Sequence, residues 1–167
     1  MKGLVSLLIT LAVLAPLQSE ATSYPPPPVI QIDVFSDPYM GTRVVHVLRE
    51  KYAGFGATIE LPGGFLPKGD LYFGFLQPGN TNPHTWAFDG EATTLLEGMH
   101  PFLEDIDLRT PPLMNTSVIA GKDIEHAFAN TDPTGMYMVF VLIVIANTNP
   151  ADHANWYGVE TTPLFVE

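Results

Sequence analysis

The histidines and carboxylates of this sequence follow no spacing that names a reaction. The histidines form no His-x-His pair and no His-Glu-x-x-His sequence, so a transition-metal site is not indicated. Cysteine is absent and no Gly-x-Ser-x-Gly motif occurs, which leaves no recognisable nucleophile. We therefore predict no catalytic residues and no enzyme activity. A small hydrolase, with a site assembled from residues distant in sequence, stays open as an alternative.

One polar stretch near the C-terminus is rich in the oxygen atoms that calcium prefers. Its candidate ligands are Asn147, Asn149, Asp152 and Asn155, but the stretch lacks the EF-hand pattern. Asparagine and aspartate side chains also cap turns by accepting hydrogen bonds from nearby backbone N–H groups. We expect no metal and no other cofactor, and these four residues are the calcium candidates if an ion is bound.

Large aromatic residues are the better candidates for binding. Rings of this size stack on sugars or anchor a protein partner when they are exposed, and they fill the core when they are not. We take five of them as predicted ligand-binding residues, and core packing is the competing interpretation: Tyr72, Trp86, Phe88, Trp156 and Tyr157.

The charge of the chain argues against two classes of partner. The net charge is −11, and lysine and arginine together number only seven. Binding to nucleic acid requires a basic surface, and so does binding to anionic lipid. We expect neither partner.

The first 21 residues have the three parts of a secretory signal peptide. Lys2 gives a positive start, residues 4–17 form an uncharged apolar core, and small residues precede a cleavage site after Ala21. The core is too short to span a bilayer comfortably, so we expect no membrane span after cleavage. A proline-rich lead-in, residues 22–28, would then precede the folded domain.

The rest of the chain is typical of short strands joined by turns. Sixteen prolines and fourteen glycines favour turns over long helices. Residues 29–35 alternate as in a half-buried strand, and the apolar run at 136–146 predicts a central strand buried on both faces. Other expected strands are 55–61, 70–77, 84–88, 101–108, 117–120, 124–129 and 164–166, whereas 43–52 fits a strand or a short helix.

This pattern predicts an all-β fold with a single domain at residues 29–167. A two-sheet, immunoglobulin-like antiparallel β-sandwich accommodates many short strands of this kind. A small β-barrel is the alternative.

Three motifs in order resemble those of uncharacterised exported bacterial β-sandwich modules of the immunoglobulin-like or fibronectin-like kind. The strand and turn at 70–79 is the first, the hairpin entry at 133–137 is the second, and the loop at 149–152 followed by Trp156 is the third. The resemblance covers about residues 70–167. It implies a β-sandwich fold and no general activity.

We therefore expect an exported, periplasmic or extracellular, non-catalytic binding or structural module. Its expected partner is another envelope or secreted protein, and a polysaccharide bound by exposed aromatic rings is the alternative. A bare edge strand would favour a protein partner. A row of coplanar aromatic rings would favour carbohydrate, and a deep pocket with histidine and carboxylate groups would favour a hydrolase.

Overall fold

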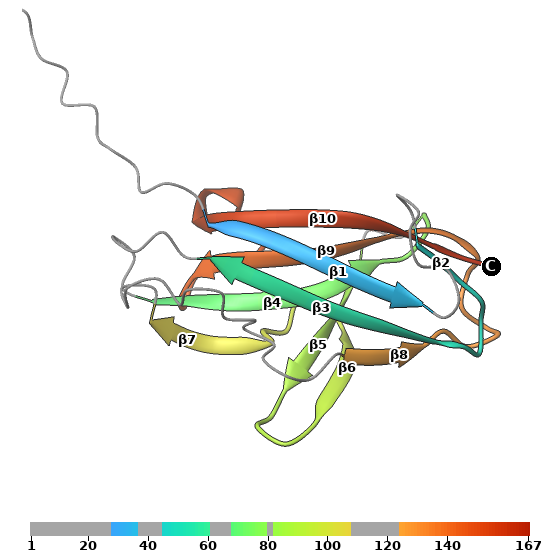
Figure 1. Cartoon of the computed structure of the whole chain (residues 1–167). Helices are drawn as coiled ribbons and strands as arrows, with labels where there is room; N and C mark the ends of the chain where they lie inside the picture. The colour runs from blue at the N-terminus through green and yellow to red at the C-terminus, as the bar shows by residue number, and fades with distance from the viewer. Residues whose placement is uncertain (1–27, 37–44, 61–67, 80–81, 108–123) are drawn as a thin grey trace, which may run out of the picture.

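The computed structural model describes residues 28–36, 45–60, 68–79, 82–107 and 124–167, which form two packed β-sheets (Figure 1). The expected signal peptide, most of the lead-in and the strand expected at 117–120 lie outside these residues. The smaller sheet has the order β1 (Val29–Ser36), β3 (Tyr52–Glu60), β8 (Ile124–Ala127). The larger sheet has the order β2 (Val45–Val47), β10 (Trp156–Val166), β9 (Gly135–Ile145), β4 (Lys68–Leu76), β5 (Pro83–Phe88), β6 (Thr93–Glu97). A further strand, β7 (Leu103–Asp107), also pairs with β4.

The strand arrangement is that of an immunoglobulin-like sandwich. β1, β3 and β8 take the places of strands A, B and E, and β4, β9 and β10 take those of C, F and G. The Tyr137 hydroxyl, near the start of β9, donates to the Pro133 carbonyl oxygen at 2.8 Å. A tyrosine bonded back to the chain at this corner is a feature of the fold. The predicted all-β sandwich is confirmed, and the described strands form two sheets rather than a closed barrel.

The main core fills the space between the two sheets. β3 shows how it forms, because every second residue from Ala53 to Ile59 is buried while the residues between them are partly exposed. Phe55 on β3 meets Trp86 of the facing sheet at a centroid distance of 4.9 Å, and Phe73 meets the same indole at 5.0 Å. Burial of these rings is the main force that holds the sheets together.

The strand predicted at 136–146 exists as β9, but the burial predicted for both faces holds over only part of it. Tyr137, Val139 and Val141 point into the main core and are buried. On the opposite face Met136 and Met138 are 46% and 36% exposed, whereas Phe140 and the apolar residues beyond it are buried. Sequence alone could not reveal this, since it does not show which elements cover the outer face of a strand.

The turn expected at the end of 70–79 and the hairpin entry expected at 133–137 are confirmed. Gly79 and Gly135 have φ values of 70° and 131°, which residues with a Cβ adopt only with strain. The Asp89 carboxylate accepts hydrogen bonds from the N–H groups of Glu91 and Ala92, at 2.9 and 2.8 Å. These bonds lower the pKa of Asp89 and close the hairpin between β5 and β6.

Two strands differ from their predictions. β6 was not predicted, because its sequence Thr-Thr-Leu-Leu-Glu lacks alternation. β10 begins at Trp156 rather than at residue 164, since pairing with β9 extends it across a proline and a glycine. The ambiguous segment 43–52 contains the short strand β2 and the first residue of β3.

Candidate binding surface

The edge of β4 changes partners halfway along its length. Its second half, from Phe73, pairs with β5, whereas its first half, up to Leu71, pairs with β7. The N–H of Phe102 donates to the Leu71 carbonyl oxygen at 2.6 Å, which fixes the residue before β7 beside β4. Because β5 leaves β4 where β7 arrives, a notch opens between the end of β5 and the start of β7.

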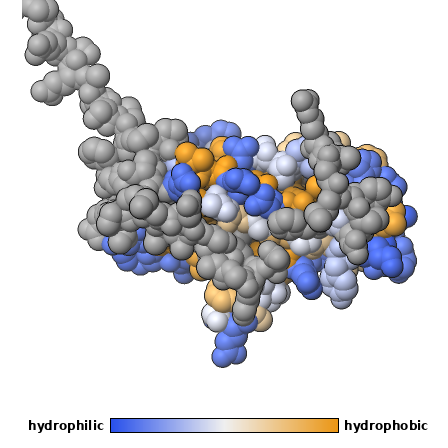
Figure 2. All heavy atoms as spheres, in the orientation of Figure 1, coloured by the Kyte–Doolittle hydropathy of each residue, from blue (hydrophilic) through white to orange (hydrophobic). Residues whose placement is uncertain are grey.

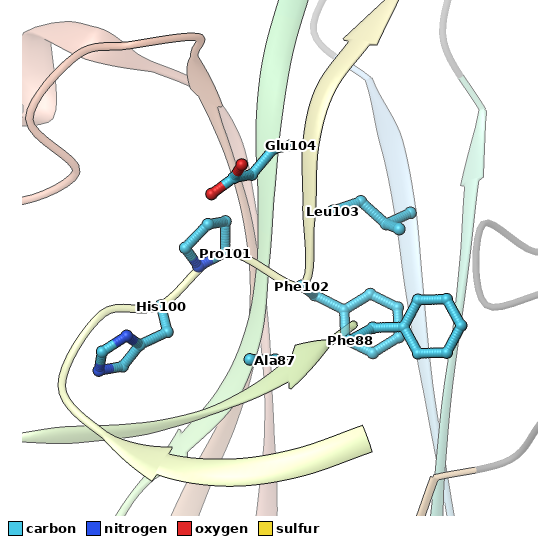
Figure 3. Close-up of a pocket in the computed structure, with 7 residues that line it drawn as sticks. All are labelled: Ala87, Phe88, His100, Pro101, Phe102, Leu103 and Glu104. Carbon is cyan, nitrogen blue, oxygen red and sulfur yellow. The ribbon is translucent and has the colours of Figure 1, made fainter. Parts of the chain in front are cut away.

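The notch is a pocket of about 370 Å³. It is lined by Ala87, Phe88, His100, Pro101, Phe102, Leu103 and Glu104 (Figure 3). Phe88 and Phe102 stack at a centroid distance of 5.8 Å on one side, and the side chains of His100 and Glu104 lie on the other (Figure 3). The pocket therefore combines an apolar wall with one carboxylate.

The His100 imidazole is used to hold the loop before β7. Its Nε2 lies 3.0 Å from the Glu97 carbonyl oxygen, and its backbone N–H donates to the Thr85 hydroxyl oxygen at 2.8 Å. The Thr85 hydroxyl in turn donates to the Gly98 carbonyl oxygen at 2.9 Å. A ring held in this way helps to fix the loop before β7.

The five predicted ligand-binding aromatics are divided between two sides of the larger sheet. Tyr72 and Trp156 belong to a second apolar cluster on the outer face of that sheet, whereas Trp86, Phe88 and Tyr157 pack in or against the main core. Trp86 is only 2% exposed and Tyr72 only 5%, so the surface exposure expected of these two is wrong. Since adjacent strand residues face opposite sides, Trp156 and Tyr157 do not form one platform.

Tyr72 and Trp156 also have clear structural roles. Burial raises the pKa of Tyr72, and the nearby carboxylates of Asp70 and Glu104 raise it further. The Trp156 indole N–H donates to the Pro150 carbonyl oxygen at 2.8 Å, and its ring lies 4.2 Å from that of His153. Trp156 thereby anchors the loop between β9 and β10 to the outer face. Ligand binding by any of the five aromatics stays a prediction.

The four calcium candidates lie in that loop, which includes the short 3-10 turn η1 (His153–Asn155). The Asn149 and Asp152 side chains each accept a bond from the N–H two residues later, both at 3.0 Å. The Asn155 amide donates to the Asn149 carbonyl oxygen at 3.0 Å. Asn147 lies at a φ of 62°. Turn capping, the competing interpretation, thus accounts for the side chains of Asn149 and Asp152.

Asp70 is a structural residue that the sequence analysis did not single out. Its carboxylate accepts the N–H groups of Asp105, at 3.0 Å, and Asn147, at 3.2 Å. Both donors have left-handed φ values, 61° and 62°. One carboxylate therefore holds two residues with left-handed φ, one in β7 and one in the loop after β9, and no pattern in the sequence connects positions so far apart.

The outer face of β9 and β10 carries exposed apolar side chains that the sequence analysis also did not single out. Met136, Met138 and Val159 are 46%, 36% and 45% exposed. The strand register places Phe165 beside Met136 and Pro163 beside Met138, so these four side chains adjoin one another. Val159 lies on the same face but farther along β10, opposite the buried Leu142 and beyond Thr161. We call these five residues the outer strip. Over the opposite sheet, Figure 2 shows apolar residues interspersed with hydrophilic ones.

Comparisons with known proteins add little to this geometry. No family model matches the chain, and no curated protein matches it. One solved structure that the chain resembles is the CARDB domain of the PF1109 protein from Pyrococcus furiosus, described as a complex with di-metal ions. The identity is 11%, the match covers 84% of this chain and 90% of that one, and the TM-score is 0.36. The fold assignment above therefore rests on strand order and on Tyr137.

The described residues contain no group of three or more histidine, aspartate or glutamate side chains placed to hold a metal ion. They also contain no helix with the length and apolar character needed to cross a membrane.

Proposed function

We propose that this chain is an exported, non-catalytic module that binds another envelope or secreted protein through the outer strip. The observation that carries the proposal is the exposure of two methionines on a strand whose other residues are mostly buried. Exposed apolar side chains that adjoin one another on a sheet face are a common feature of protein-binding surfaces.

The chemistry of the outer strip suits a protein partner. Methionine is flexible and polarisable, so it adapts to the shape of an apolar surface placed against it. Pro163 and Phe165 extend the same apolar surface onto β10, and Val159 lies farther along the same face, beyond Thr161. A chain with a net charge of −11 selects partners whose contact surface is ringed by basic residues.

The aromatic residues support this proposal over carbohydrate binding. Sugar recognition needs exposed rings, and Trp86 and Tyr72 are buried instead. A hydrolase would need its ionisable groups to converge, and His100 is held by the Glu97 carbonyl oxygen.

The proposal is tested by capture of a partner with the tagged mature chain and matched variants. Met136→Gln together with Met138→Gln makes the strip polar without changing charge, and Val29→Gln is the control, since Val29 is 63% exposed on the other sheet. Cross-linked envelope and culture-medium fractions are the sources. We expect one protein at stoichiometric yield with the wild type and the control, and about tenfold less with the double variant. Equal recovery by both variants, or recovery of polysaccharide alone, contradicts the proposal.

A further inference from the structure

We propose that β6 is a docking edge that takes up an extended, basic segment of a partner protein as an additional strand of the larger sheet. The inference rests on the proposed function only in that the ligand is a protein. It concerns an edge of the sheet, whereas the outer strip lies on its face, so separate variants test the two.

The hydrogen-bond pattern shows which backbone groups of β6 point outward. The N–H of Gly98 donates to the Pro83 carbonyl oxygen at 2.8 Å, and the N–H of Asp89 donates to the Ala92 carbonyl oxygen at 3.2 Å. Both pairs lie in the register that joins β5 and β6. Hydrogen-bonded pairs alternate in an antiparallel ladder, so Thr94 and Leu96 also bond to β5. The backbone groups of Thr93, Leu95 and Glu97 therefore face away from β5.

β6 lacks three of the features by which natural sheets block their edges, namely lysine, proline and a bulge. Its sequence contains no lysine and no proline, and its register with β5 runs from Glu97 to Thr93 without a bulge. In the part of the chain that the structure describes, β6 is the last strand of the sheet order. A regular, unblocked edge is a template for another strand.

The position of β6 makes this edge accessible. The hairpin of β5 and β6 projects beyond the two packed sheets (Figure 1). Four of the five residues of β6 are exposed, including Leu96 at 37%. Leu95 is partly buried and packs against the main core, which fixes the strand in place. An added strand would find a rigid partner and would cover Leu96.

The charges around β6 select a basic segment. Glu97 ends the strand, and Asp89 and Glu91 lie in the turn that precedes it, so carboxylates stand at both ends of the edge. A segment with basic residues near its two ends complements this arrangement. A second copy of the chain does not, because two molecules that each carry a charge of −11 repel one another.

A synthetic peptide of defined sequence tests the inference. The probe is fluorescein-labelled Lys-Thr-Val-Thr-Val-Thr-Lys with blocked ends, and fluorescence anisotropy measures its binding to the mature chain. Thr93→Pro removes one outward N–H and leaves the bonds to β5 intact, whereas Thr93→Val keeps the N–H. We expect the wild type and Thr93→Val to bind alike and Thr93→Pro to bind about tenfold more weakly.

Changes to the peptide test the inference even if the proline variant fails to fold. A peptide methylated at alternate amide nitrogens cannot pair along one edge, and a peptide with Glu in place of Lys reverses the charge. We expect each to bind the wild type about tenfold more weakly than the probe. Amide hydrogen exchange of the wild type should slow at Thr93, Leu95 and Glu97 when the probe is bound.

Several results would overturn the inference. They are failure of the wild type to bind the probe, equal binding by Thr93→Pro, equal binding of the methylated peptide, and protection of amides elsewhere. Self-association of the wild type that Thr93→Pro abolishes would identify a second copy as the occupant instead. The Met136→Gln, Met138→Gln variant should bind the probe like the wild type, so failure of the strip and failure of the edge are distinguishable.

Discussion

β7 and β6 are the two strands at the edge of the larger sheet beyond β4, and they are built in opposite ways. β7 contains a β-bulge, since Glu104 and Asp105 together oppose Asp70, and Asp105 has a left-handed φ of 61°. Lys68 donates to the Asp105 carboxylate at 2.6 Å, which adds an ion pair across β4 and β7. β6 has neither a bulge nor such a pair.

The difference shows that an edge without a bulge is particular to β6 and is not general to this sheet. Both strands are five residues long, and both lie on the same side of the sheet. The bulge of β7, together with the ion pair between Lys68 and Asp105, discourages pairing with another strand, as edge protection usually does. The same chain therefore contains a protected edge as an internal standard for the unprotected one.

Removal of Phe102 should have the largest effect, because this ring lies where β7 joins the core. Phe102 stacks on Phe88 and meets Phe73 edge-on at 6.5 Å. We expect Phe102→Ala to lower the free energy of unfolding by about 3 kcal/mol, measured by urea denaturation. Amide exchange should accelerate in β7 more than in β6. A loss below about 1 kcal/mol would show that β7 docks without this ring.

Loss of the Asp70 carboxylate should have the next largest effect. Asp70→Ala leaves the N–H groups of Asp105 and Asn147 to water, and we expect a loss of about 1 to 2 kcal/mol in urea denaturation. Asp70→Asn keeps one acceptor oxygen and should lose less. Asn147→Gly in the Asp70→Ala background should recover part of the loss, because glycine adopts positive φ readily. No recovery would mean that backbone strain is not what Asp70 offsets.

Acid should destabilise the fold to a smaller extent, through His126 on β8. Burial lowers the pKa of His126 below its ordinary value of 6.5; the His84 imidazole lowers it further and the Asp132 carboxylate opposes both. The unfolded chain then binds this proton at a higher pH than the folded chain, so stability is lost as the pH falls through 6.5. We expect the Tm to fall between pH 7.5 and 5.5, and His126→Gln to flatten that slope. An unchanged slope would assign the pH dependence to other groups.

Loss of the Lys68 ammonium should have the smallest effect. Both partners of the ion pair are exposed: the Lys68 side chain is 46% exposed and the Asp105 side chain is 54% exposed. We expect Lys68→Ala to change the free energy of unfolding by no more than about 0.5 kcal/mol, and less at high salt. A larger loss would mean that the ion pair, rather than Asp70 and the bulge, holds β7 closed.

Features that arise from neighbours along the chain were predicted, and features that depend on distant contacts were not. The strands at 29–35 and 70–77 and the turns at Gly79 and Gly135 were predicted, because alternation and positive φ leave local traces in a sequence. β6 was missed since its sequence Thr-Thr-Leu-Leu-Glu does not alternate and only Leu95 is partly buried. The aromatic surface was partly wrong, because ring size predicts burial and binding equally well, and Trp86 is buried.

The sequence by itself determined the all-β class, the main strands and the acidic charge, since composition and periodicity act through neighbours along the chain. Only the tertiary structure decided which strand faces were covered and which edges were left open. It also brought Asp70, Asp105 and Asn147 together, from positions far apart in sequence. These features depend on contacts between distant segments, and the outer strip and the edge of β6, on which the proposed binding depends, are both of this kind.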